Sequence, residues 1–318
     1  MAFQIGTYTD GANLRNTAAI FGASNGWTVN KNDSSHLALQ KGSLYFNFGS
    51  DMRIQGSTGF DGGLAWDNQP GSTSFDVYGS MFTPSGETYS ANLEKSGGSY
   101  FMAIHGDTFA IMAEGQRQWS QLIFGATKHG IAGYTCTFGG GTGRFIGSQS
   151  GVPLDELQAP GCMLSVASMQ PNIGTTVGCG SRASFLVDGV WTKLGDLSSG
   201  SLSSPIYSNS FSISDYPEQQ FIGLSGPLVN VSGGEYRGNV PLTPTYFMKV
   251  YSATVEDSLA NVRFIGDFDG VKLINALEFK NGDPVFNGSD EYFLSKINEI
   301  SQVDNYGKNK YAIAVLKA

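Results

Sequence analysis

Acidic residues lie among regularly spaced glycines between residues 266 and 293, and acidic side chains at alternating positions are what a calcium loop uses. Asp267, Asp269 and Gly270 supply only a fragment of such a loop, and β-like runs rather than helices flank it. Asp-Gly and Asn-Gly dipeptides instead fit two-residue hairpin turns, because glycine accepts a positive φ. These dipeptides are Asp269-Gly270, Asn281-Gly282 and Asn287-Gly288. The segment therefore predicts turns and no metal ligands.

Other residues that could do chemistry stand outside recognisable motifs. His36, His105 and His129 are the three histidines, and no serine lies in a G-x-S-x-G elbow that would make it a nucleophile. The glycine-rich run at 138–145 lacks the Lys-Ser/Thr ending of a phosphate-binding loop. We expect the histidines at the surface or in turns, no catalytic residue, no cofactor and no enzymatic activity.

Cysteine spacing and charge exclude further classes of protein. Cys136, Cys162 and Cys179 are too few and too widely spaced for a disulfide framework or a Cys-x-x-Cys zinc site, so buried thiols are predicted. The 27 acidic residues outnumber the 19 basic ones, and a net charge of −8 does not favour nucleic acid as a partner. The first residues lack the pattern of a signal peptide, and no apolar run is long enough for membrane insertion. Synthesis in the cytoplasm is therefore expected.

One loop offers a better candidate for a contact site. Trp66 lies in the sequence GLAWDNQPGS, which is rich in Gly, Asp, Asn and Pro. A large ring in such a loop either folds back on a sheet as an anchor or contacts a sugar or a partner protein, and the frequent burial of aromatic residues favours the anchor. Trp66, Asp67 and Gln69 are the candidate interface or ligand contacts.

Composition predicts the elements that must position this loop. The chain of 318 residues is 40% hydrophobic and only 14% charged, and its 43 glycines separate short apolar runs. This pattern predicts a mainly β protein, with an antiparallel β-sandwich-like framework, a short N-terminal helix and long irregular loops. Asp10 is the predicted cap of the helix, Leu14, Ala18 and Phe21 share its apolar face, and Gly22 or Gly26 ends it. Hairpins are predicted at Lys41-Gly42, within 73–83 and at His105-Gly106-Asp107.

The local composition of the sequence divides the chain into three parts. Residues 1–125 carry the helix and antiparallel strands, and residues 246–318 carry further strands that we expect to complete the same framework. Residues 126–245 are rich in glycine and serine with only short apolar runs, so we expect this middle region to supply loops that contact neighbouring proteins.

The order of these segments resembles a family of virion structural proteins of tailed bacteriophages. The resemblance rests on Asp67, Gln69, Pro70 and Gly71 in the loop, on the Asp269-Gly270-Val271 element, and on a terminal strand that ends at Ala318. It implies a structural component of the tail, baseplate or tail-fibre attachment region. Its partners would be other virion proteins in a symmetric, multi-copy assembly. The alternatives are a module that binds host surface glycans or a receptor, and a polysaccharide hydrolase.

Overall fold

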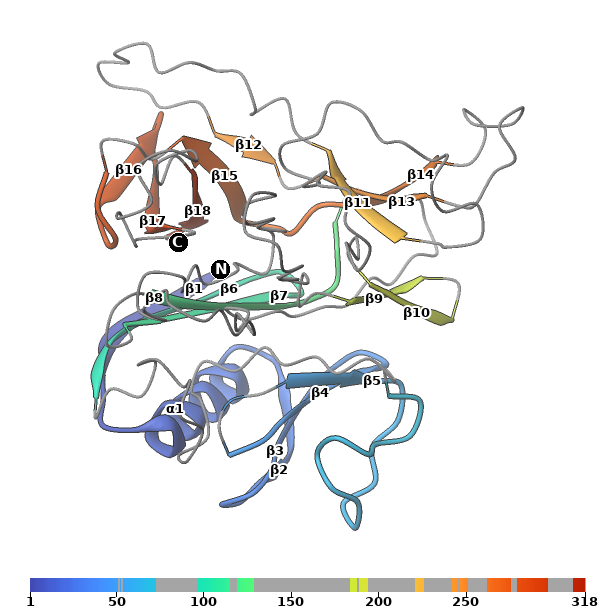
Figure 1. The fold of residues 1–318 in the computed structure, drawn as a ribbon. Helices are drawn as coiled ribbons and strands as arrows, with labels where there is room; N and C mark the ends of the chain where they lie inside the picture. The colour runs from blue at the N-terminus through green and yellow to red at the C-terminus, as the bar shows by residue number, and fades with distance from the viewer. Residues whose placement is uncertain are drawn as a thin grey trace, which may run out of the picture.

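The computed structural model shows a mainly β protein with one helix near its N-terminus (Figure 1). It describes residues 1–50, 52, 54–72, 97–114, 119–128, 184–187, 189–193, 221–225, 242–244, 246–250, 262–275, 279–296 and 311–317. The strands in these ranges form five antiparallel sheets. The largest of them stack in layers around a central sheet, as the sandwich-like prediction required (Figure 1).

The central sheet is apolar on both faces. Its strand order is β1 (Ala2–Tyr8), β6 (Gly98–His105), β7 (Thr108–Glu114) and β8 (Trp119–Gly125). The last six residues of β6 and the first six of β7 are all buried, so neither face of these strands meets water. A sheet with two apolar faces needs a layer on each side.

The N-terminal layer covers one face. It contains the helix α1 (Gly11–Ser24) and a sheet in the order β2 (Thr28–Asn32), β3 (Leu37–Lys41), β4 (Leu44–Phe48) and β5 (Ile54–Ser57). Phe21 and Trp27 meet Phe109 of β7 edge to face, with ring centroids 5.7 Å apart in each pair. Phe124 of β8 packs 5.0 Å from Phe46. Aromatic packing therefore joins this layer to the central sheet.

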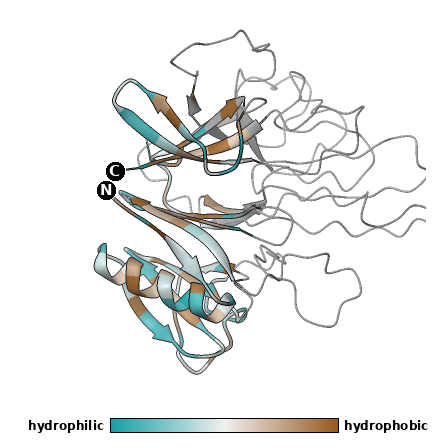
Figure 2. Ribbon diagram, turned by 90° about the vertical axis from the view of Figure 1, so that its left-hand side faces the viewer, coloured by the Kyte–Doolittle hydropathy of each residue, from teal (hydrophilic) through white to brown (hydrophobic). Residues whose placement is uncertain are grey.

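The C-terminal layer covers the other face. Its sheet has the order β12 (Thr243–Pro244), β15 (Val271–Asn275), β18 (Tyr311–Leu316), β17 (Asp290–Lys296) and β16 (Pro284–Asn287). Phe293 of β17 stacks on Phe101 of β6, with centroids 4.4 Å apart and planes at 5°. Gln121 of β8 donates to the hydroxyl and the carbonyl oxygen of Ser295 at 2.8 and 3.1 Å. Both views place the two chain termini close together, and Figure 2 shows them at the left edge of these layers (Figures 1 and 2).

Two smaller sheets complete the described strands. One pairs β9 (Ser184–Val187) with β10 (Val190–Lys193). The other has the order β11 (Phe221–Ser225), β13 (Tyr246–Val250) and β14 (Val262–Gly266). Phe185 and Val187 of β9 belong to the main core, which ties the first of these sheets to the layers.

Local sequence signals predicted the helix α1 and two N-terminal hairpins correctly, whereas strand β1 was not predicted. Asp10 caps α1 by accepting from the amide of Asn13 at 2.8 Å, and Leu14, Ala18 and Phe21 are buried as predicted. Hairpins β3–β4 and β6–β7 turn at the predicted places. The predicted hairpin within 73–83 lies outside the described residues, and so does most of the loop-rich middle region.

The predicted hairpin turns of the C-terminal part need correction. Gly270, Gly282 and Gly288 all have a positive φ, of 71°, 80° and 63°. Only the last lies in a hairpin, between β16 and β17. The turn at Gly270 instead connects β14 to β15, which belong to different sheets. The turn-forming dipeptides identified the bends correctly. They do not indicate which strands pair with the strands on either side of each bend.

The expectation of surface histidines is wrong for the two that the structure describes, because His36 and His105 are each only 2% exposed. His105 ends β6, and its Nε2 lies 2.7 Å from the carbonyl oxygen of Leu316 on β18. A carbonyl only accepts, so Nε2 carries the proton and Nδ1 is the unprotonated nitrogen. Burial lowers the pKa of His105, although its hydrogen bond to Leu316 acts in the opposite direction. The neutral imidazole therefore joins the central and C-terminal sheets.

Removing the ring that joins the two sheets should destabilise the chain strongly. We expect Phe293→Ala to lower the free energy of unfolding by about 3–5 kcal/mol, because it leaves a cavity under Phe101. Phe286→Ala is the matched control, since Phe286 lies on the neighbouring strand and is 48% exposed; its effect should stay within about 0.5 kcal/mol. Chemical denaturation measures both values, and equal effects would show that the stacked pair does not hold the layers together.

A fall in pH should weaken the contact between the central and C-terminal sheets at His105. A histidine whose pKa is lowered in the fold contributes stability that is fully present above its ordinary value of 6.5 and is lost as the pH falls below it. His36 has the same direction of shift. We expect His105→Gln, whose amide can still donate to Leu316, to lose less unfolding free energy than the wild type on acidification. Denaturation above and below pH 6.5 checks this, and an identical loss in both proteins would contradict it.

Candidate functional site

The segment that contains the predicted contact residues is a closed loop, residues 58–72, which we call the clamped loop. It follows β5 and lies against the sheet β2–β5. Phe60 at its start stacks on Tyr45 of β4, with ring centroids 6.2 Å apart and planes at 19°. Lys31 of β2 donates to the carbonyl oxygen of Gly62 at 3.0 Å. The amide of Gly59 donates to the carbonyl oxygen of Pro70 at 3.0 Å, which brings the two ends of the loop together.

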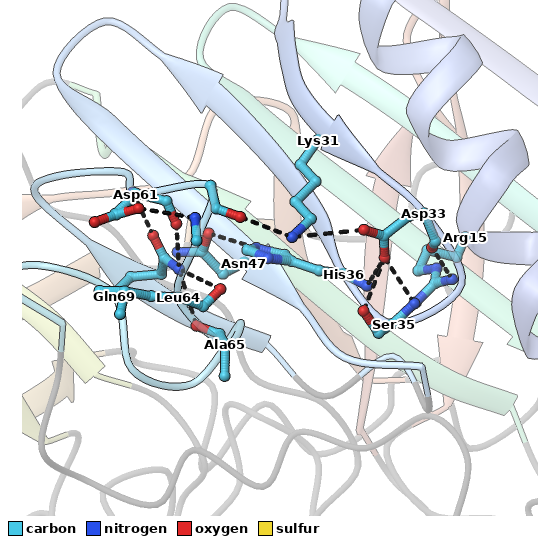
Figure 3. A network of polar contacts seen from close by, with 12 residues as sticks. Arg15, Lys31, Asp33, Ser35, His36, Asn47, Asp61, Leu64, Ala65 and Gln69 are labelled. Atoms are coloured by element: carbon cyan, nitrogen blue, oxygen red, sulfur yellow. Dashed lines mark hydrogen bonds and ion pairs between the residues drawn. The ribbon is translucent and has the colours of Figure 1, made fainter.

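Gln69 holds the inside of the clamped loop (Figure 3). Its side chain is 3% exposed, and its Oε1 accepts from the amide of Asp61 at 2.8 Å. Its Nε2 donates to the carbonyl oxygens of Ala65 at 2.9 Å and of Asp61 at 3.1 Å. One amide side chain therefore satisfies backbone groups that would otherwise be unpaired, as buried polar groups require.

Turn-forming residues shape the rest of the clamped loop. Asp61 accepts from the amide of Gly63 at 2.8 Å through its Oδ1, which is an Asx turn. The amide of Ser72 donates to the carbonyl oxygen of Gln69 across Pro70 and Gly71 at 3.1 Å. Gly71 has φ +63°, as the third residue of a type II turn after proline requires. A Cβ at this position would also lie 2.0 Å from the Oγ1 of Thr58. The run Gln69-Pro70-Gly71 is therefore determined by the loop's geometry.

A residue far along the chain fixes the end of the loop. Trp191 of β10 donates through its Nε1 to the carbonyl oxygen of Gly71 at 2.8 Å. Its ring lies against Gly56 of β5, where an added Cβ would be 2.4 Å from the Cη2 atom. Gly56 is thus required as glycine, because the indole ring occupies the space of a side chain.

A polar network supports the loop from the side of the helix (Figure 3). Arg15 of α1 donates to the carbonyl oxygen of Asp33 at 2.5 Å, and the carboxylate of Asp33 accepts from the amide and hydroxyl of Ser35, each at 2.8 Å. These hydrogen bonds from Ser35 hold the pKa of Asp33 well below its ordinary value. Lys31 lies 3.5 Å from the same carboxylate and thereby joins this turn to the clamped loop.

The second branch of the network is buried. The Nδ2 of Asn47 donates to the hydroxyl of Ser57 at 2.8 Å, so its Oδ1 faces the Nε2 of His36 at 3.1 Å. An amide oxygen only accepts, so His36 donates through Nε2, which the neutral imidazole does when its proton is on Nε2. Burial lowers the pKa of His36, which favours this neutral form. Ser57 in turn donates to the carbonyl oxygen of Gly59 at 2.8 Å. This hydrogen bond fixes the start of the clamped loop.

The structure separates the three predicted contact residues by role. Trp66 and Asp67 lie on one turn, where the amide of Asn68 donates to the carbonyl oxygen of Ala65 at 3.1 Å; Trp66 is half-buried and Asp67 is exposed. Gln69 points inward and stabilises the loop itself. Sequence reasoning missed the exposed Leu64, and it missed Trp191, whose role no local signal indicates because it comes from a distant strand.

No protein-family model matches the chain, and neither does any curated protein. Within the described ranges, no group of three or more His, Cys, Asp or Glu side chains is placed to hold a metal ion. No helix in the described part of the chain has the length and apolar character needed to cross a membrane.

Converting the clamping amide to an acid should open the loop. Gln69→Glu removes the two N–H donors and places a carboxylate beside the carbonyl oxygens of Asp61 and Ala65, at a cost of about 1–3 kcal/mol or more. The matched control is Asn68→Asp, which makes the same chemical change at the exposed neighbouring residue. Hydrogen exchange at the amides of Gly59 and Asp61 should become faster in the first variant only. Unchanged exchange in Gln69→Glu would show that other contacts hold the loop.

Proposed function

We propose that this chain is a structural component of a tailed-bacteriophage virion, in the tail, baseplate or tail-fibre attachment region, and that it acts through protein–protein assembly. The observation that carries the proposal is the clamped loop, which presents Leu64, Trp66 and Asp67 on a base held by Gln69 and Trp191. The resemblance of its Asp67, Gln69, Pro70 and Gly71 to the family motif supports the same assignment.

The clamped loop suits assembly because its shape is set before any partner binds. Binding costs free energy when flexible loops must be ordered, and a loop already closed by its own hydrogen bonds avoids that cost. Tryptophan is enriched among the residues that contribute most to protein interfaces, and Leu64 beside it is 36% exposed. Asp67 and Asn68 provide a polar rim around these apolar groups.

The proposal assigns no catalytic role. Both described histidines are engaged in the framework, His36 with Asn47 and His105 with the backbone of Leu316. The partners would be other virion proteins, with the chain present in multiple copies at the tail after synthesis in the host cytoplasm. The predicted contribution of residues 126–245 to these contacts lies largely outside the described residues.

Glycan or receptor binding is the second candidate, and the arrangement at Trp66 favours it. A partly exposed indole beside the polar side chains of Asp67 and Asn68 combines an apolar face with hydrogen-bonding groups, as sugar sites do. The two candidates differ in their requirements. Assembly needs a protein neighbour on the clamped loop, whereas glycan binding leaves the loop open to solvent in the particle.

Charge reversal on the loop should reduce incorporation into particles. We expect mass spectrometry of gradient-purified particles from the encoding phage to find the chain in fixed, multi-copy stoichiometry, and Asp67→Lys to lower that amount. Asp290→Lys is the matched control, because Asp290 is also exposed and is the first residue of β17, directly after the turn from β16. Absence of the chain from purified particles would contradict the proposed function. Full incorporation of Asp67→Lys, with loss of binding to host polysaccharide, would favour the second candidate.

A further inference from the structure

Strand β1 is a long edge of the central sheet with no partner strand on its outer side among the described residues. It pairs with β6 over all seven residues from Ala2 to Tyr8, without a register shift. The strand is drawn in blue in the central layer of Figure 1, and the strand order makes it an edge of that sheet. An unprotected edge presents a row of backbone donors and acceptors that another strand can pair with.

The side chains of β1 make this edge apolar and uncharged. Phe3 is 44% exposed and Ile5 is 52% exposed, and with the exposed Thr7 they alternate along one face of the strand. None of the residues in AFQIGTY carries a charged side chain, whereas the whole chain has a net charge of −8. Strand β1 therefore exposes an apolar, uncharged strip, and an acidic chain that binds there meets no negative charge.

Several other described edges are protected in ways that β1 is not. The edge strand β2 contains Lys31 and has a register shift between Val29 and Lys31. The edge strand β16 begins with Pro284, and β12 has only two residues, Thr243 and Pro244. On the far side of the central sheet, β8 is buried from Gln121 to Gly125. Lysine, proline, bulges and short length are the usual devices against edge pairing, and β1 has none of them.

We propose that β1 pairs with β1 of a second copy of this chain, antiparallel across a twofold axis, and joins two central sheets into one. A register centred on Ile5 places Ile5 opposite Ile5 of the second copy and Phe3 opposite Thr7 of the second copy. Antiparallel partners that face each other directly lie on the same side of the sheet, so the exposed apolar residues of both copies form one strip.

A second copy is the occupant that the charge pattern favours. A strongly charged partner strand would find no opposite charge along β1, and an uncharged apolar strand is what the identical copy offers. A twofold contact also uses the same surface on both subunits and closes on itself, as most homo-oligomers do. Although the chain as a whole is acidic, β1 contains no carboxylate, so two paired β1 strands would not repel each other through like charges.

This pairing identifies a second copy of the chain as one partner in the proposed assembly. Its role in a particle rests on the proposed function. One strand pair is small beside the roughly 800 Å² per partner of a standard stable interface, so the isolated dimer should form reversibly with rising concentration. Copies held together in a particle would pair at a high effective concentration.

Sedimentation velocity of the purified full chain over a range of concentrations tests the pairing. We expect the wild type to dimerise, and Ile5→Lys to raise the dissociation constant by about tenfold or more, because it places a charge on the edge. Ile20→Lys is the matched control, since Ile20 is 61% exposed on α1 and away from the edge. It should dimerise as the wild type does. Circular dichroism confirms that each variant is folded.

A cysteine probe tests the register and does not depend on the charged variant. Mild oxidation should link two copies of Ile5→Cys through the introduced thiols, because residue 5 faces itself across the twofold axis. Ile20→Cys is the control, and the wild type gives the background from its three native cysteines. We expect peptide mapping to find the cross-link at position 5 only.

Three outcomes would overturn the pairing. They are a wild type that stays monomeric, a dimer unaffected by Ile5→Lys, and equal cross-linking at positions 5 and 20. A monomeric chain whose β1 amides become protected only in the particle would identify a strand of another protein as the occupant. The proposed function fails separately: a chain that dimerises through β1 but is absent from particles keeps the pairing and loses the virion role.

Discussion

The structure depends on covering both faces of the central sheet. Strands β6 and β7 are buried over almost their whole length, so their apolar side chains point in both directions and require a layer on either side. The N-terminal layer supplies Phe21 and Trp27 against Phe109, and the C-terminal layer supplies Phe293 against Phe101. The first and last parts of the chain are thus held on one sheet, and the hydropathy view shows apolar segments in all three layers (Figure 2).

Two features lie outside this core, namely the clamped loop and the exposed edge strand β1. The N-terminal layer needs only one face of its sheet for the core, and Lys31 of β2 is free to support the clamped loop, which Trp191 of β10 also holds. The edge strand β8 of the central sheet is buried from Gln121 to Gly125, whereas the edge strand β1 exposes Phe3 and Ile5. A rigid loop and an uncharged edge are both surfaces on which a neighbour can bind without reorganising the core.

Sequence signals predicted elements where neighbouring residues determine the structure. The helix α1 was predictable because Asp10, Leu14 and Phe21 act within a few residues of one another, and the hairpin β6–β7 because its two strands are joined by a short turn. Gly270 was correctly identified as a bend but wrongly assigned to a hairpin, because a positive φ does not specify which strands pair on either side.

The candidate site was only partly predictable for the same reason. The loop sequence pointed to Trp66, Asp67 and Gln69, yet the inward direction of Gln69 depends on backbone groups brought near only when the loop closes. Trp191 reaches Gly56 and Gly71 from a strand more than a hundred residues away, as the 120-residue separation of its hydrogen bond shows. The burial of His105 likewise requires β18, the last strand of the chain.

We propose that this framework presents assembly surfaces within a virion, and a reconstruction of the intact particle tests this proposal most directly. The account predicts repeated density for the three-layer framework in the tail region, with the clamped loop against a neighbouring protein and β1 extended by a strand of a second copy. Particles without such density, or with both the clamped loop and β1 facing solvent, would contradict it.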